Sequence, residues 1–173
     1  MVLVDTNLLV FALMAREGHL TPETTASVRT LRSAGQVAIS AMSWLEVQLH
    51  IRPLQRAALK HIAHSAPLWR IIDIDDRIAS RAAELMTLRT ADPQVCPSCW
   101  SVKRASPCKT CKRLVSRPQR FADAVIVATA ECDPDIHVLY TFDSGVLDMG
   151  RLVTSIEIVR PQPTEREAAL RSP

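Results

Sequence analysis

Short apolar runs alternate along the chain with longer stretches in which apolar residues recur at helical spacing. The short runs have the length of buried strands and lie at 2–4, 36–40, 69–74, 137–141 and 153–159. The longer stretches predict helices at 6–15, 21–35, 43–51, 54–64, 75–90 and 119–132, with a loop or short helical turn at 143–149. Strands that alternate with helices form a mostly parallel sheet covered on both faces. The pattern therefore predicts an α/β fold.

The segment from Asp92 to Pro118 departs from this alternation. It contains four prolines and four cysteines and has no regular apolar period. We interpret it as a module inserted into a domain that spans 1–160, and we expect the polar, proline-flanked residues 161–173 to form a frayed C-terminal tail. The 173 residues are enough for one domain with a sizeable core.

The sequence predicts neither a membrane-spanning segment nor a signal peptide. No stretch reaches the roughly 18 apolar residues of a membrane span, and strand residues begin at Val2, where a signal peptide would be basic. We therefore expect the protein in the cytoplasm, where thiols stay reduced.

Basic residues concentrate in one part of the chain. Seven of the 21 Lys and Arg residues lie between Pro93 and Ala122, where no Asp or Glu occurs, which leaves 14 basic against 18 acidic residues elsewhere. Such segregation predicts contact with a polyanion, and the alternative is a solvated loop whose charges aid solubility. The seven residues are Lys103, Arg104, Lys109, Lys112, Arg113, Arg117 and Arg120.

Two Cys-x-x-Cys pairs lie within this basic module, Cys96 with Cys99 and Cys108 with Cys111. Two such pairs at short separation are typical of a Zn²⁺ site, and four thiolates complete a tetrahedral shell with no position left for catalysis. We therefore expect a structural zinc, which would supply the folding free energy of a segment too short and polar for a core of its own. Redox dithiols or disulfides are the alternatives. Cys132, outside the module, is expected to be a packed thiol.

Four acidic side chains fall near the ends of predicted elements. Asp5 ends the first strand and Asp143 follows the fourth, so both belong to the carboxyl edge of a parallel sheet, where such folds bind ligands. Glu46 lies early in the helix that follows the second strand, and Asp123 lies in the first turn or so of the helix 119–132. Since helix starts and strand ends meet at that edge, the four acids are expected to cluster.

A carboxylate cluster of this kind predicts metal-assisted chemistry. Carboxylates repel one another unless a cation lies among them, and oxygen-rich sites suit Mg²⁺ or Mn²⁺. One or two such ions can activate water and neutralise charge on a phosphate, which predicts hydrolysis of a phosphodiester. Each acid also has an ordinary structural explanation: Glu46 in a capping box begun by Ser43, Asp5 and Asp143 as caps, and Asp123 beside the helix dipole.

Several of these motifs together resemble the PIN-domain ribonucleases, and most closely the VapC-type toxins of bacterial and archaeal toxin–antitoxin pairs. The resemblance covers most of residues 1–160 apart from the insertion. It rests on Asp5-Thr6-Asn7, on Glu46 in its Ser-x-x-Glu context, on the helix Phe121–Ala130 with its Ala-Asp-Ala-x-Ile-x-Ala-x-Ala pattern, and on Thr141-Phe142-Asp143.

The resemblance implies a three-layer α/β/α fold with a central parallel sheet. It implies a Mg²⁺ or Mn²⁺ site at the positions of Asp5, Glu46, Asp123 and Asp143, with metal-activated water as the attacking group. The positions of Asn7 and Thr141 would support or orient these acids, and a homodimer is expected.

We therefore expect a metal-dependent endoribonuclease, the toxin of a toxin–antitoxin pair, whose zinc arm lies beside the catalytic edge. The basic residues of the arm are candidates to contact RNA phosphates. Trp100 is a candidate to stack on a base, or else packs against the zinc knuckle. The alternatives are an RNA-maturation or other PIN nuclease, or a non-catalytic module that binds RNA or protein through the arm. Some ribosome-maturation PIN nucleases also carry a zinc ribbon, but it follows their PIN domain.

Overall fold

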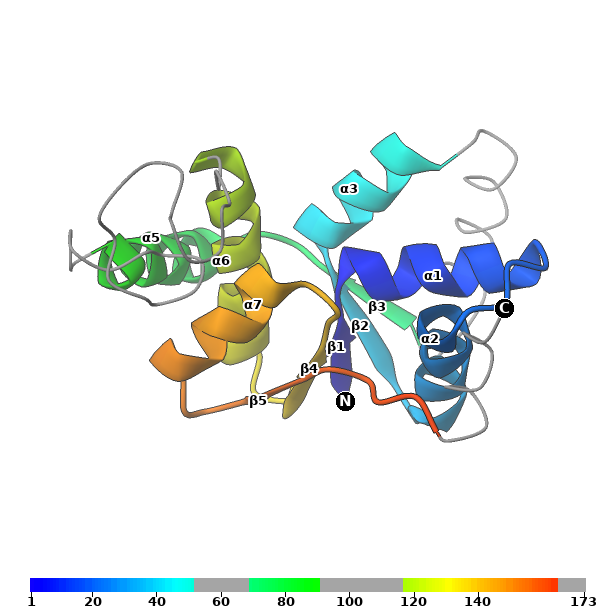
Figure 1. Ribbon diagram of the computed structural model, residues 1–173. Coiled ribbons are helices and arrows are strands. Elements are labelled where there is room, and N and C mark those ends of the chain that lie inside the picture. The colour runs from blue at the N-terminus through cyan, green and yellow to red at the C-terminus, as the bar shows by residue number, and fades with distance from the viewer. Residues whose placement is uncertain (52–68, 91–116, 165–173) are drawn as a thin grey trace.

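The computed structural model describes residues 1–51, 69–90 and 117–164 (Figure 1). Within them, five strands form one sheet in the order β3-β2-β1-β4-β5, and every neighbouring pair is parallel. All five predicted strands are confirmed, as β1 (Val2–Val4), β2 (Val37–Ser40), β3 (Trp69–Ile72), β4 (Val138–Tyr140) and β5 (Glu157–Val159).

Helices cover both faces of this sheet, which confirms the expected three layers. Helices α1 (Thr6–Arg16), α2 (Pro22–Ser33) and α3 (Ala41–His50) lie on one side, and α5 (Asp76–Thr90), α6 (Arg117–Cys132) and α7 (Ser144–Met149) lie on the other (Figure 1). A short 3₁₀ turn, Gly150–Leu152, follows α7. None of the helices in the described ranges is long and apolar enough to cross a membrane.

The side chains of the central strands alternate between two hydrophobic cores. Leu3 and Ala38 belong to the core that the strands share with α5, α6 and α7. Their neighbours Val4, Val37 and Ile39 belong to the core shared with α1 and α3. Because successive residues of a strand point to opposite faces, a strand covered on both sides must be apolar throughout. The continuous apolar runs in the sequence have this cause.

Helix α3 begins at Ala41, and its N-cap lies three residues before the Ser43 of the capping motif. The N-cap is Ser40, whose hydroxyl accepts a hydrogen bond from the Met42 backbone N–H at 3.2 Å. Ser43 instead lies inside the first turn, and its buried hydroxyl has no partner among the described residues. The alternative explanation of Glu46, a capping box begun by Ser43, is therefore wrong.

Helix α6 also begins earlier than expected, at Arg117, inside the segment assigned to the insertion. Pro118 fits there because the N–H that proline lacks has no partner in a first helical turn. Asp123 consequently lies at the end of the second turn, and the first turn contains no acid. A helix dipole acts within its first turn, so the dipole explanation for Asp123 is wrong.

The predicted tail is packed where it begins. Pro161 is buried, and the Arg29 guanidinium on α2 donates a hydrogen bond to the carbonyl oxygen of Gln162 at 2.6 Å. The predicted helix 54–64, the four cysteines of the module and residues 165–173 lie outside the described residues.

Candidate functional site

The carboxyl ends of β1 and β4 open into a cavity of about 490 Å³, which we call the acidic cavity. All four predicted acids line it, and each comes from a different part of the fold: the ends of β1 and β4, and helices α3 and α6. The lining residues are Asp5, Thr6, Asn7, Val10, Glu46, Asp123, Ile126 and Asp143. The four acids therefore line one cavity at this edge of the sheet.

Asp5 is fixed at the floor of the cavity by two hydrogen bonds. Its side chain is buried, and it accepts from the Thr6 backbone N–H at 2.6 Å and from the Thr141 hydroxyl at 2.6 Å. Asp5 is also the N-cap of α1, so its structural explanation and its place in the cavity hold together.

The surroundings of Asp5 disfavour its ionised form. The pKa of Asp5 is raised from 3.8 to about 6, and the largest cause is burial. The two hydrogen bonds lower the pKa and so offset part of this effect, while the nearby negative charges of Asp143 and Glu46 contribute to the rise. Fixed donors and unfavourable desolvation at one carboxylate are features of functional sites more often than of plain helix caps.

Thr141 ties the ends of β1 and β4 together. Its hydroxyl donates to Asp5 and accepts a hydrogen bond from the Asp143 backbone N–H at 2.9 Å. The residue is completely buried, so water does not compete for these bonds. Thr141 thus holds two of the acids in fixed relation. Asn7, the other predicted supporting residue, lines the acidic cavity directly.

Thr6 is a site residue that the sequence analysis did not single out. Its hydroxyl donates a hydrogen bond to Glu46 Oε2 at 2.5 Å, although the two residues are 40 positions apart. This bond reaches from α1 to α3 and orients the Glu46 carboxylate in the cavity. The available signal was a hydroxyl side chain beside Asp5, but nothing in the sequence identifies its acceptor.

Gly145 makes room for two carboxylates at the start of α7. A Cβ atom at this position would collide with Asp123 Oδ2 and would lie 2.9 Å from Asp143 Oδ1. The Gly145 backbone N–H donates to the same Asp143 oxygen at 2.5 Å, so Asp143 caps α7 as well as lining the cavity. Both acids therefore approach the helix backbone in a way that other side chains would prevent.

The donor set fits a hard divalent cation in its chemistry. Four carboxylates and the Asn7 amide supply the oxygen ligands that Mg²⁺ and Mn²⁺ prefer. The carboxylates line the cavity wall without converging on one point, since no three His, Cys, Asp or Glu side chains in the described ranges are close enough together to hold one ion. The side chains that line the cavity therefore have the chemistry of a Mg²⁺ or Mn²⁺ site.

The predicted zinc ligands and most of the predicted RNA contacts fall outside the described residues. These are Cys96, Cys99, Cys108, Cys111, Trp100, Lys103, Arg104, Lys109, Lys112 and Arg113. Arg117 and Arg120 fall in the first turn of α6, the helix that brings Asp123 to the cavity.

Comparison with known families decides the affiliation of the chain. The profile of the PIN domain matches residues 2–152, which includes every strand but β5 and all four acids of the cavity. The chain belongs to the PIN domain family. No curated protein sequence matches this PIN domain.

Two of the solved structures similar to this PIN domain come from bacterial protein complexes. A chain of a toxin–antitoxin complex from Klebsiella pneumoniae has 20% sequence identity and a TM-score of 0.58, with 95% of this chain and 100% of that chain covered. A chain of VapBC2 from Rickettsia felis, bound to a DNA fragment from its promoter, has 13% identity and a TM-score of 0.55, with 92% and 98% covered. At these identities the likeness establishes the fold.

Proposed function

We propose that this PIN domain is a divalent-metal-dependent endoribonuclease and the toxin of a toxin–antitoxin pair. The observation that carries the proposal is the meeting of Asp5, Glu46, Asp123 and Asp143 in one cavity at the carboxyl edge of the sheet. PIN domains are generally nucleases, and two similar solved structures are of a toxin–antitoxin complex and of VapBC2.

The chain's own residues supply the fixed frame of this proposed site. Asp5 is held by two donors, Thr6 orients Glu46, and the backbone of Gly145 accommodates Asp123 and Asp143. Together these acids would hold Mg²⁺ or Mn²⁺, which supplies charge neutralisation at the phosphate and a more acidic water. The hydrogen bonds from Thr141 and Thr6 fix the Asp5 and Glu46 carboxylates before any cation binds.

The finer features of the proposal concern partners and the insertion. We propose that an antitoxin protein binds the chain, that the chain forms a homodimer, and that a structural zinc held by the four module cysteines supports a basic arm for RNA in the cytoplasm. A different RNA substrate, as in maturation nucleases, would use the same acids. A non-catalytic binding module would not need four acids in one cavity.

Cleavage of RNA by the variant Asp123→Asn tests the catalytic proposal. The substitution keeps the shape of the side chain and removes one negative charge from the cavity, so we expect cleavage at saturating Mg²⁺ to fall about 100-fold or more. Asp76→Asn is the matched control, because Asp76 is exposed on α5 and does not line the cavity.

Two outcomes would contradict the proposal. Unchanged cleavage and unchanged metal dependence in Asp123→Asn would remove the acid cluster from the mechanism. Absence of Mg²⁺ or Mn²⁺ binding by the intact wild-type protein, measured by calorimetric titration, would favour the non-catalytic module instead.

A further inference from the structure

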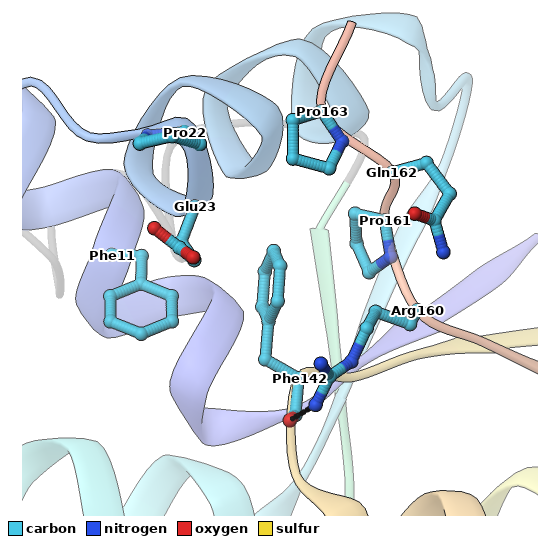
Figure 2. A pocket seen from close by; sticks show the side chains of 8 residues that line it. All are labelled: Phe11, Pro22, Glu23, Phe142, Arg160, Pro161, Gln162 and Pro163. Atoms are coloured by element: carbon cyan, nitrogen blue, oxygen red, sulfur yellow. Dashed lines mark hydrogen bonds between the residues drawn. The ribbon is translucent and has the colours of Figure 1, made fainter. Parts of the chain in front are cut away.

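A second cavity, of about 450 Å³, shares two wall segments with the acidic cavity (Figure 2). On α1, Val10 lines the acidic cavity and the next residue, Phe11, lines this one. After β4, Phe142 lines the second cavity, while its neighbour Asp143 lines the first. We call the second space the aromatic cavity. The two cavities are therefore adjacent across α1 and the β4–α7 connection.

The aromatic cavity has flat apolar walls. The rings of Phe11 and Phe142 meet edge to face, with centroids 5.3 Å apart and planes at 76°. Figure 2 shows the Phe142 ring between Phe11 on one side and Pro161 and Pro163 on the other. Both phenylalanines are only partly buried, so their rings remain accessible from the cavity. Such a slot suits a planar ring better than a branched aliphatic group.

Charged groups lie at the border of this apolar slot. The Arg160 guanidinium donates a hydrogen bond to the Phe142 carbonyl oxygen at 2.7 Å, which holds the cation at the cavity. The Glu23 carboxylate, from the first turn of α2, lines the same space (Figure 2). An acceptor and a donor beside a flat apolar surface can together engage the polar edge of a base while its faces stack.

We propose that the aromatic cavity binds one unpaired nucleobase of the RNA substrate, next to the bond that is cleaved. This inference rests on the proposed nuclease function and adds to it a subsite for the substrate. The base stacks on the face of Phe142, the nearly perpendicular Phe11 ring contacts its edge, and Arg160 contacts the base edge or its phosphate. Because the wall is shared with the acids, one strand of RNA reaches both cavities.

Binding of a fluorescent single-stranded oligoribonucleotide, measured by anisotropy without added Mg²⁺ or Mn²⁺, tests the subsite without cleavage. Phe11→Leu and Phe142→Leu keep apolar volume but remove the aromatic faces, so we expect affinity to fall about 5- to 100-fold. Phe142→Tyr keeps the ring and should bind like wild type. Leu88→Ala removes apolar surface at an exposed residue of α5 outside the cavity and should have no effect.

A single abasic nucleotide, placed at successive positions of the oligoribonucleotide, identifies the bound base. At one position the abasic change should weaken binding to wild type and have no further effect in Phe142→Leu, because ring and base form the same contact. Affinities unchanged in both leucine variants, or abasic effects that add to Phe142→Leu at every position, would overturn the subsite. If those variants instead lose only binding to a protein partner, the cavity is a peptide site and the proposal is wrong.

The same measurements separate this inference from the nuclease proposal. Cleavage by wild type together with unchanged RNA binding by the leucine variants would refute the subsite alone. The expected binding pattern without any Mg²⁺-dependent cleavage would refute the nuclease and leave an RNA-binding cavity. Thermal unfolding of each variant checks that the loss of a ring has not unfolded the protein.

Discussion

Asp5 shows how one residue can satisfy two explanations that the sequence presents as alternatives. A residue directly after a strand and before a helix is well placed to cap the helix, and the same position puts its second oxygen at the edge of the sheet. The sequence therefore predicts where Asp5 lies but cannot separate cap from site. The separating observations are burial and the neighbouring acids, which come from residues more than 40 positions away.

The pH dependence of stability should report the raised pKa of Asp5 in metal-free protein. An acid whose folded pKa lies above its unfolded value stabilises the fold most below about pH 3.8 and loses that contribution as the pH rises through about 6. Between pH 5 and 7.5 this amounts to roughly 1 kcal/mol. We expect urea unfolding of wild type, compared with Asp5→Asn, to show that difference. Identical pH slopes for the two proteins would contradict it.

The hydrogen bond from Thr6 to Glu46 predicts a graded effect of two substitutions. Thr6→Val keeps the shape of the side chain and removes the hydrogen-bond donor, so we expect the Mg²⁺ concentration required for half-maximal activity to rise about tenfold. Thr6→Ser retains the hydroxyl and should retain most of the activity. The measurement is the Mg²⁺ concentration at half-maximal RNA cleavage. Thr25→Val removes a hydroxyl from α2, away from the acidic cavity, and serves as the control. Equal behaviour of Thr6→Val and Thr6→Ser would show that the bond does not position Glu46.

At the scale of elements, the sequence predicts type and order better than boundaries. The strands were evident because each is a short apolar run between helical stretches. The starts of α3 and α6 were not, because Ser40 and Ser43 are both competent caps and Pro118 is compatible with a first turn as well as with a loop. These shifts matter for function, since they remove the ordinary structural explanations for Glu46 and Asp123.

The start of α7 predicts the effect of a single methyl group. Gly145→Ala would favour the helix by about 1 kcal/mol on propensity alone, but its Cβ would overlap the Asp123 carboxylate. We therefore expect the protein to fold while RNA cleavage and Mg²⁺ binding fall at least tenfold, measured by cleavage rate and calorimetric titration. Gly150→Ala is the matched control, since its nearest neighbour would be Ile158 at an ordinary 3.6 Å. If both variants behave alike, the contact with Asp123 is not critical.

At the scale of the molecule, the periodicity predicted an α/β fold with its acids at one edge, and the sheet has that form. The periodicity did not give the order of the strands, because pairing depends on contacts between distant residues. It also could not find Thr6, Gly145 or the aromatic cavity, whose roles arise only when separate elements meet. Sequence patterns indicate local secondary structure and the chemistry of each side chain. They do not indicate which distant residue a side chain will contact.

The cysteine module remains a prediction at this scale. If Cys96, Cys99, Cys108 and Cys111 share one ion, protein purified without added zinc should contain about one Zn per chain by elemental analysis. Cys99→Ser together with Cys108→Ser should lose it, whereas Cys132→Ser, outside the module, should not. Fully reduced wild type without zinc would contradict the assignment.

The central position of β1 has a consequence for the nascent chain. Asp5 depends on Thr141, 136 residues later, and β1 completes its pairing only when β4 is available. Such distant contacts close late in folding, and synthesis delivers the chain from its N-terminus. The acidic cavity therefore cannot assemble until residue 143 has been translated. A site built in this order stays inactive on the ribosome until β4 and Asp143 have left the exit tunnel.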